Sequence, residues 1–328
     1  MAVSIAREQD ILKLPPPKRP PRLTSRRIGI HTSIAGGVEN AAERAYRLGC
    51  NTFQVFSTSP RQWQPYTLSR PQCDQMNRLR EKYGLKPLVI HVNYLINLAS
   101  TTPQFLEKSL LAFRGEAERA LGLCAEYLVL HPGSFRGASR EEGLARVAAS
   151  IQVATRDLDL NSGKLTVLIE NTAGAEFSLG GTFEQVAELI GRLRGIVPVA
   201  ACIDTCHVHV AGYDIVSKEG MRLTLSHLDA TVGLKNVWVW HCNDAKAERG
   251  SRLDRHEHIG SAYAGRPRLL LHRSPDQSRI CGLDRLDRRQ PVSRHPLCPG
   301  HGPPPVPAGT RRPRFARASS NPDLRHRF

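Results

Sequence analysis

The sequence lacks any apolar stretch approaching the ~18 residues that a membrane-spanning helix needs. Its N-terminus has no apolar signal core, and Glu8 and Asp10 argue against an organelle transit peptide. None of its eight cysteines forms a C-x-x-C pair, and the chain is too long to need a disulfide framework. We therefore expect a cytoplasmic protein with reduced thiols and no contact with a membrane.

Lysine and glutamate are both absent from residues 261–328, although the rest of the chain uses them freely. This tail has eleven Pro, and its fourteen Arg and four Asp supply +10 of the chain's net charge of +16. Such a composition does not readily pack a core. It favours a tail that is translated in an altered reading frame or comes from unrelated sequence. The alternative is a native disordered extension that binds nucleic acid. Residues 1–26, centred on PPPKRPPR, favour a flexible Pro-rich basic leader.

Between residues 27 and 260, short apolar runs alternate with longer amphipathic segments. The short runs are almost continuously apolar, as expected of parallel strands buried on both faces. Seven such β-then-α units predict an α/β fold, a TIM (β/α)8-type barrel. An open doubly wound sheet is the main competitor, but no Gly-rich dinucleotide fingerprint follows the first run. The predicted strands are 28–31, 52–57, 87–91, 127–131, 166–170, 197–204 and 237–243, and the predicted helices include 38–48, 103–121, 140–157 and 183–194.

Five consecutive predicted strands end in side chains that bind metals. One histidine after an apolar run is more often structural than a ligand, but the C-terminal strand ends of a barrel surround one mouth. Histidines and carboxylates crowded there suit zinc or manganese in a catalytic site. Clustered divalent ions act on phosphate esters, so the pattern indicates phosphodiester hydrolysis. The candidate ligands are His91, His131, Glu170, Asp204, His207 and His241, with Asp254 and His256 from a following loop.

Eight segments of this region resemble the endonuclease IV family, the zinc-dependent apurinic/apyrimidinic endonucleases of base excision repair. They are IGIHTSIAGGVENAAERA, NTFQVFSTSPRQW, HVNYLINLAS, LVLHPGS, LIENTAG, IDTCHVHVAGYD, HCNDAK and SRLDRHEHIG, between residues 28 and 260. The resemblance implies a monomer that cleaves double-stranded DNA 5′ to abasic sites, leaving a 3′-hydroxyl and a 5′-deoxyribose phosphate.

The resemblance also implies three zinc ions. The first is held by His91, His131 and Glu170, and the third by His207, Asp254 and His256. The second shares Glu170 and is bound by Asp204 and His241, so Glu170, Asp204 and His241 form the implied catalytic group. His209 and His258 fall outside this pattern, and we expect them beside the ligands or at the surface.

The same resemblance places DNA-contacting residues in two loops on the face of the site. Arg61, Gln62 and Trp63 follow the second predicted strand, and Tyr94 with Leu95 follows the third. Stacking side chains of this kind can fill the gap that a flipped nucleotide leaves. The competing interpretation makes Trp63 and Tyr94 ordinary packing residues.

The chain departs from the family at its last strand. Family members end with an LETP-like strand whose Glu binds the second zinc, but no Glu follows Glu257 here. We therefore expect a barrel without a proper eighth strand and with one carboxylate too few, whose activity is impaired. Two alternatives remain: a non-catalytic relic that binds abasic DNA, and a metal-dependent sugar isomerase, which the His-rich ligand set disfavours.

Overall fold

The structure is a computed structural model that describes residues 11–17, 27–63, 66–162, 164–260 and, for the backbone alone, 280–283. The predicted leader and tail lie mostly outside these residues. Within the leader, Ile11 is buried, and the guanidinium of Arg47 donates a hydrogen bond to the carbonyl of Leu14. No helix in the described ranges is long and apolar enough to cross a bilayer.

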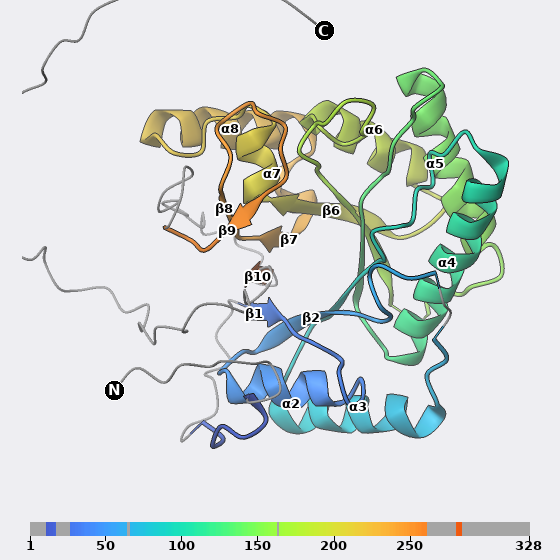
Figure 1. The fold of residues 1–328 in the computed structure, drawn as a ribbon, viewed down its shortest axis with the longest axis vertical. Helices are drawn as coiled ribbons and strands as arrows, with labels where there is room; N and C mark the ends of the chain where they lie inside the picture. The colour runs from blue at the N-terminus through green and yellow to red at the C-terminus, as the bar shows by residue number, and fades with distance from the viewer. Residues whose placement is uncertain (1–10, 18–26, 64–65, 163, 261–279, 284–328) are drawn as a thin grey trace, which may run out of the picture. The chain divides into compact units, whose positions relative to one another are not determined.

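Eight parallel strands form a closed barrel in the order β1-β10-β7-β6-β5-β4-β3-β2 (Figure 1). This arrangement confirms the predicted TIM-type barrel and rules out the open doubly wound sheet. The strands are β1 (Arg27–His31), β2 (Thr52–Phe56), β3 (Leu88–His91), β4 (Tyr127–Leu130), β5 (Thr166–Glu170), β6 (Val199–Asp204), β7 (Val237–His241) and β10 (Ile280–Leu283).

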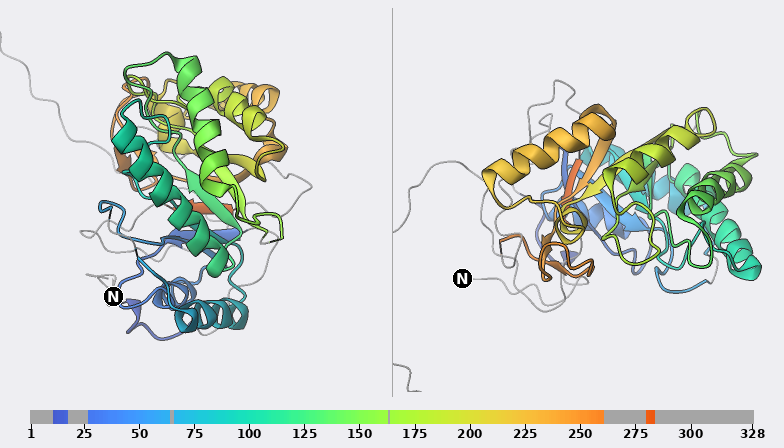
Figure 2. Two further views of the ribbon diagram at one scale, coloured as in Figure 1. Left: turned by 90° about the vertical axis from the view of Figure 1, so that its right-hand side faces the viewer. Right: turned by 90° about the horizontal axis from the view of Figure 1, so that it is seen from above.

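Helices pack on the outer side of this sheet (Figure 2). The helix α6 follows its predicted spacing, because Phe183, Val186, Leu189, Ile190 and Leu193 are its buried residues. The helix α5 begins with a capping box, in which Ser139 and Glu142 satisfy each other's backbone N–H groups. The helical elements are α2 (Asn40–Arg47), α3 (Arg70–Tyr83), α4 (Pro103–Gly122), α5 (Arg140–Thr155), α6 (Phe183–Leu193), α7 (Thr205–Val210), α8 (Lys218–Thr231) and the 3-10 turn η1 (Leu234–Asn236), and a hairpin pairs β8 (Asp244–Ala245) with β9 (His256–Glu257).

The expected absence of an eighth strand is wrong for the backbone. Residues Ile280–Leu283 pair in parallel with both β1 and β7 and close the barrel. Backbone pairing depends little on side-chain composition, so an Arg-rich and Pro-rich surrounding sequence does not prevent this closure. The strand ICGL nevertheless contains no carboxylate, and its register sets Gly282 beside His241 on one side and Gly29 on the other.

The barrel interior carries an apolar floor beneath the strand ends. Side chains alternate between the two faces of a strand, so a residue and its second neighbour point the same way. Five floor residues are each followed, two positions later, by a predicted metal ligand. The pairs are Val89 and His91, Val129 and His131, Leu168 and Glu170, Cys202 and Asp204, and Val239 and His241.

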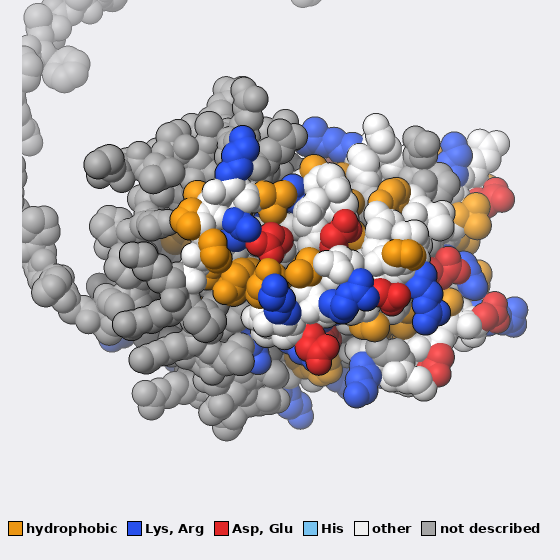
Figure 3. Space-filling view, turned by 90° about the horizontal axis from the view of Figure 1, so that it is seen from below, with side chains coloured by type: hydrophobic (Ala, Val, Ile, Leu, Met, Phe, Trp, Pro, Cys, Tyr) orange, Lys and Arg blue, Asp and Glu red, His pale blue; other side chains and the backbone are white. Residues whose placement is uncertain are grey.

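Charges of both signs are interspersed on the face seen from below (Figure 3). The described part of this face therefore shows no broad one-sign surface, in line with the concentration of the basic excess in the tail sequence. Five cysteines, Cys50, Cys73, Cys124, Cys202 and Cys206, are free thiols as expected. Cys242 is disulfide-bonded, so the prediction of reduced thiols is wrong at that position.

Candidate metal centre

Glu170 lies at the centre of the predicted ligands and is 1% exposed. Its Oε2 is 3.1 Å from the Nε2 atoms of both His91 and His131. Its Oε1 is 2.7 Å from Nδ1 of His241 and 3.8 Å from Nδ1 of His207. The two carboxylate oxygens of Glu170 thus face two different sets of histidines, so this carboxylate could be shared by two metal ions.

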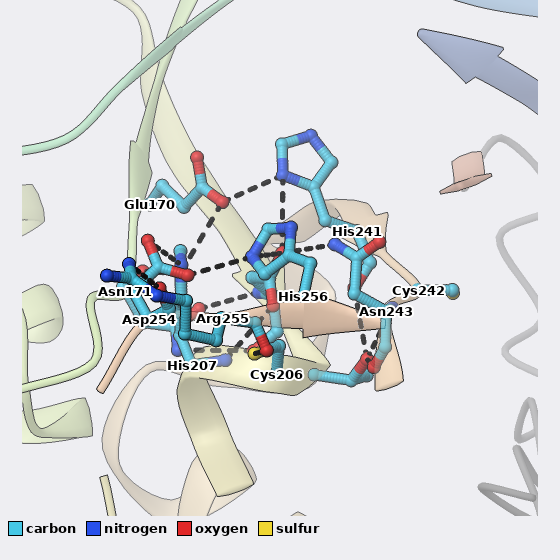
Figure 4. A network of polar contacts seen from close by, with 12 residues as sticks. Glu170, Asn171, Cys206, His207, His241, Cys242, Asn243, Asp254, Arg255 and His256 are labelled. Carbon is cyan, nitrogen blue, oxygen red and sulfur yellow. Dashed lines mark hydrogen bonds and ion pairs between the residues drawn. The ribbon is translucent and has the colours of Figure 1, made fainter. Parts of the chain in front are cut away.

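A second group forms around Asp254 (Figure 4). Its Oδ2 is 3.3 Å from Nε2 of His207, and its Oδ1 is 3.1 Å from Nε2 of His256. His207 belongs to the short helix α7, whereas Asp254 and His256 come from the chain that links β8 to β9 and from the start of β9. This group therefore depends on a loop for two of its three members.

Asp204 connects the two groups. Its Oδ2 is 4.0 Å from Nδ1 of His241 and 3.8 Å from Nε2 of His256. Its Oδ1 accepts the backbone N–H of His207 at 3.0 Å, so the carboxylate also caps the N-terminus of α7. The amide nitrogen of Asn243 donates to Oδ2 at 2.6 Å. All eight predicted ligands are therefore gathered at one end of the barrel.

The pKa values in the site move in opposite directions for acids and bases. Burial alone raises the pKa of Glu170, but His241 and His131 lower it well below its usual range. Burial lowers the pKa of His207, but Asp204, Asp254 and Glu170 raise it to about 9. The pKa of His241 likewise lies well above its ordinary value, because Cys202 and Glu170 outweigh burial. Without a metal, the site therefore holds protons that a cation must displace.

The residues fit divalent metal ions. Ligand atoms lie within 4.8 Å of one another in the trio His91, His131 and Glu170 and in the trio His207, Asp254 and His256. Buried carboxylates that face several imidazoles are costly unless they are paired or bind metal. Nitrogen and oxygen donors with open positions suit catalytic zinc. Among the described residues, Cys202 and Cys206 also belong to possible ligand groups, which the sequence analysis did not predict.

Several supporting residues were missed by sequence reasoning. The side-chain oxygen of Asn171 accepts the backbone N–H of Asp204 at 2.7 Å, and its carbonyl oxygen accepts a hydrogen bond from Nδ1 of His207 at 2.8 Å. Asn243 supports Asp204. Both asparagines follow a ligand-bearing strand end by one or two positions, a pattern that could have identified them.

The predicted DNA-contacting residues lie in two neighbouring loops. Tyr94 is 45% exposed, and its ring lies 5.3 Å from that of His91 and 5.1 Å from that of Phe56. Arg61 and Gln62 are exposed and Leu95 is half-buried. Trp63 packs edge-on against Phe105, as the packing interpretation predicted for it.

Asn93 joins these two loops. Its amide nitrogen donates to the carbonyl oxygens of Ser59, at 3.0 Å, and Gln62, at 2.7 Å. The loop after β2 is thereby held against the loop after β3, beside the metal-ligand residues.

The two histidines expected outside the pattern take no part in the ligand groups. His209 is 3% exposed within α7, so it is a buried residue. His258 is half-buried just after β9. Neither belongs to any possible ligand group of the described residues.

Comparisons with known proteins agree with this architecture. A family model described as "Xylose isomerase-like TIM barrel" matches residues 42–270. The "Probable endonuclease 4" of Solibacter usitatus is 47% identical over 252 residues, covering 75% of this chain and 86% of that protein. The "Probable endonuclease 4" of Chloroflexus aurantiacus is 39% identical over 240 residues, covering 73% of this chain and 83% of that protein. The crystal structure of endonuclease IV from Thermus thermophilus superposes with a TM-score of 0.71 at 37% identity, covering 80% of this chain and 93% of that one. The chain therefore belongs to the endonuclease IV family of xylose isomerase-like TIM barrels.

Proposed function

We propose that this chain is a zinc-dependent endonuclease that hydrolyses the phosphodiester bond 5′ to abasic sites in duplex DNA. The observation that carries the proposal is the convergence of Glu170, three histidines and Asp204 at the barrel mouth, next to the Asp254 group. Zinc held by these residues would supply an activated water and would stabilise charge on the attacking and leaving oxygens of a phosphodiester.

The chain's own residues define where those ions bind. Glu170 faces His91 and His131 with one oxygen and His241 with the other, so it would be shared by two ions. Asp204 lies between His241 and His256, and with His241 it would hold the second ion. The apolar floor seals the barrel beneath these groups, so the reacting phosphate approaches only from the strand-end side.

DNA recognition falls to the two loops joined by Asn93. The ring of Tyr94 contacts that of His91 and is exposed, a position from which it can stack on a base beside the lesion. Arg61 in the neighbouring loop supplies a positive charge for the phosphate backbone or a wedge for the gap in the duplex.

The departure at β10 predicts a weakened enzyme. Gly282 occupies the register position beside His241, so the described residues of β10, Ile280–Leu283, would offer no carboxylate to a metal held there. This observation favours a second candidate function, binding of abasic DNA without cleavage.

The deciding experiment incubates the purified full chain with zinc and a duplex that carries one abasic-site analogue and a 5′ label. We expect incision at the lesion that ends in a 3′-hydroxyl, stops after chelation and returns on adding zinc. An undamaged duplex and the Glu170→Gln variant serve as controls. Tight binding of the damaged duplex without incision, at any zinc concentration, would support the second candidate and exclude the first.

A further inference from the structure

Three histidines of the site each have one ring nitrogen in a hydrogen bond to an oxygen that is not a carboxylate. Nδ1 of His91 lies 2.8 Å from the carbonyl oxygen of Val92, and Nδ1 of His207 lies 2.8 Å from that of Asn171. A carbonyl oxygen can only accept, so Nδ1 carries the proton and Nε2 is left for a metal. His241 is reversed: its Nδ1 faces Glu170, and its Nε2 lies 2.8 Å from the side-chain oxygen of Gln54.

Gln54 differs from a backbone carbonyl because its amide has a donor end and an acceptor end. If the oxygen faces His241, Nε2 of the ring carries the proton and Nδ1 can bind a metal. If the amide were turned over, its NH2 group would donate to Nε2, and the proton would move to Nδ1. A protonated Nδ1 cannot be a metal ligand. The orientation of one amide therefore decides whether His241 can bind.

His31 sets that orientation from the opposite end. Its Nδ1 lies 3.0 Å from the amide nitrogen of Gln54 and accepts a hydrogen bond from it. His31 and Gln54 are register partners on β1 and β2, and the side chains of His31, Gln54 and His241 are all buried. The ring of His31 is itself held against Phe56, with centroids 4.4 Å apart.

Packing alone does not explain why a polar side chain occupies position 54. In register it lies opposite Val89, a member of the apolar floor. A buried amide is costly unless its donor and acceptor are both satisfied, and here each end meets one imidazole.

We propose that Gln54 and His31 are positioning residues that fix the Nδ1 atom of His241 as its metal-binding nitrogen. The inference rests on the proposed function for the role of His241 as a ligand. It assigns the orientation of a metal ligand to two residues outside the possible ligand groups of the described chain.

The test measures zinc stoichiometry and affinity by competition with a chelator. In Gln54→Leu we expect one zinc to bind about 10- to 100-fold more weakly, with the other zinc ions unchanged. Gln54→Glu keeps an acceptor for Nε2 and should stay close to wild type. His31→Phe frees the amide to turn and should give an intermediate loss. Val89→Ala is the matched control, because it disturbs the floor without touching the hydrogen-bonded chain.

A second measurement separates orientation from general loss of structure. Histidine-selective 15N NMR of the zinc-loaded protein should show His241 protonated at Nε2 in wild type. Equal zinc affinity in Gln54→Leu and wild type, or a proton on Nδ1 of His241, would overturn this inference and leave the proposed function standing. A wild-type protein that binds no zinc would overturn both.

Discussion

The two ligand groups of the site are built differently. The group around Glu170 stands on strand ends; Glu170, His91 and His241 are buried, and His131 is 27% exposed. The group around Asp254 draws on a loop, and the side chains of Asp254 and His256 are 50% and 28% exposed. Side chains on strands above a packed floor are held by the barrel itself, whereas loop-borne ligands are held only by local contacts. We therefore expect the first group to be the rigid part of the site and the second to be the adaptable part.

Removal of the central carboxylate should have the largest effect. Glu170→Gln leaves three imidazoles without their shared counter-charge, and we expect loss of two zinc ions and an incision rate lower by about 1,000-fold, equivalent to several kcal/mol. Zinc analysis and single-turnover cleavage measure both quantities. Glu116→Gln provides the control, since Glu116 is an equally buried carboxylate that contacts Ser57 on the barrel's outer side. Similar zinc loss in both variants would contradict a special role for Glu170.

A pH titration of the metal-free protein probes His207, which faces both groups. A pKa raised to about 9 stabilises the folded state at every pH below the unfolded value of about 6.5, and this contribution disappears as the pH rises through 9. We expect the free energy of unfolding in chelator to fall between pH 6.5 and pH 9 by at most about 3 kcal/mol. Urea denaturation measures this slope, and His207→Gln should flatten it. An unchanged slope in that variant would assign the effect to other groups.

A substitution in the loop-borne group should have a smaller and more local effect. We expect Asp254→Asn to weaken one zinc by about 10- to 100-fold while the zinc ions bound by Glu170 remain. Metal analysis after dialysis against a weak chelator checks this outcome. Asp214→Asn is a suitable control, because Asp214 pairs with Arg249 nearby without belonging to a ligand group. If Asp254→Asn emptied the whole site, the distinction between a rigid and an adaptable group would be wrong.

The smallest effect is expected far from both groups. Ser139→Ala removes the N-cap of α5 and should lower the free energy of unfolding by about 1 kcal/mol. Zinc content and incision should not change, so the variant sets the baseline against which losses in either ligand group are judged. Thermal unfolding at fixed zinc concentration measures the shift.

The convergence of the strand-end residues could be predicted because each follows a short apolar run that is easy to identify. His91, His131 and Glu170 end such runs, and the barrel rule brings those ends together. Gln54 was missed because it lies inside a strand and its partner His241 is 187 positions away. The strand Ile280–Leu283 was missed because its surroundings are rich in Arg and Pro, while its pairing uses backbone groups that composition does not reveal.

The arrangement of floor residues and candidate ligands in successive layers has an evolutionary consequence. The floor residues contribute to stability, and the residues two positions later carry the chemistry. The two layers can therefore change independently. Gly282 illustrates this: the ring of strands closes through its backbone at a position that has no side chain to bind a metal. A lineage of such barrels can therefore lose metal ligands one at a time and keep its scaffold. The same scaffold can later regain a ligand or acquire another chemistry.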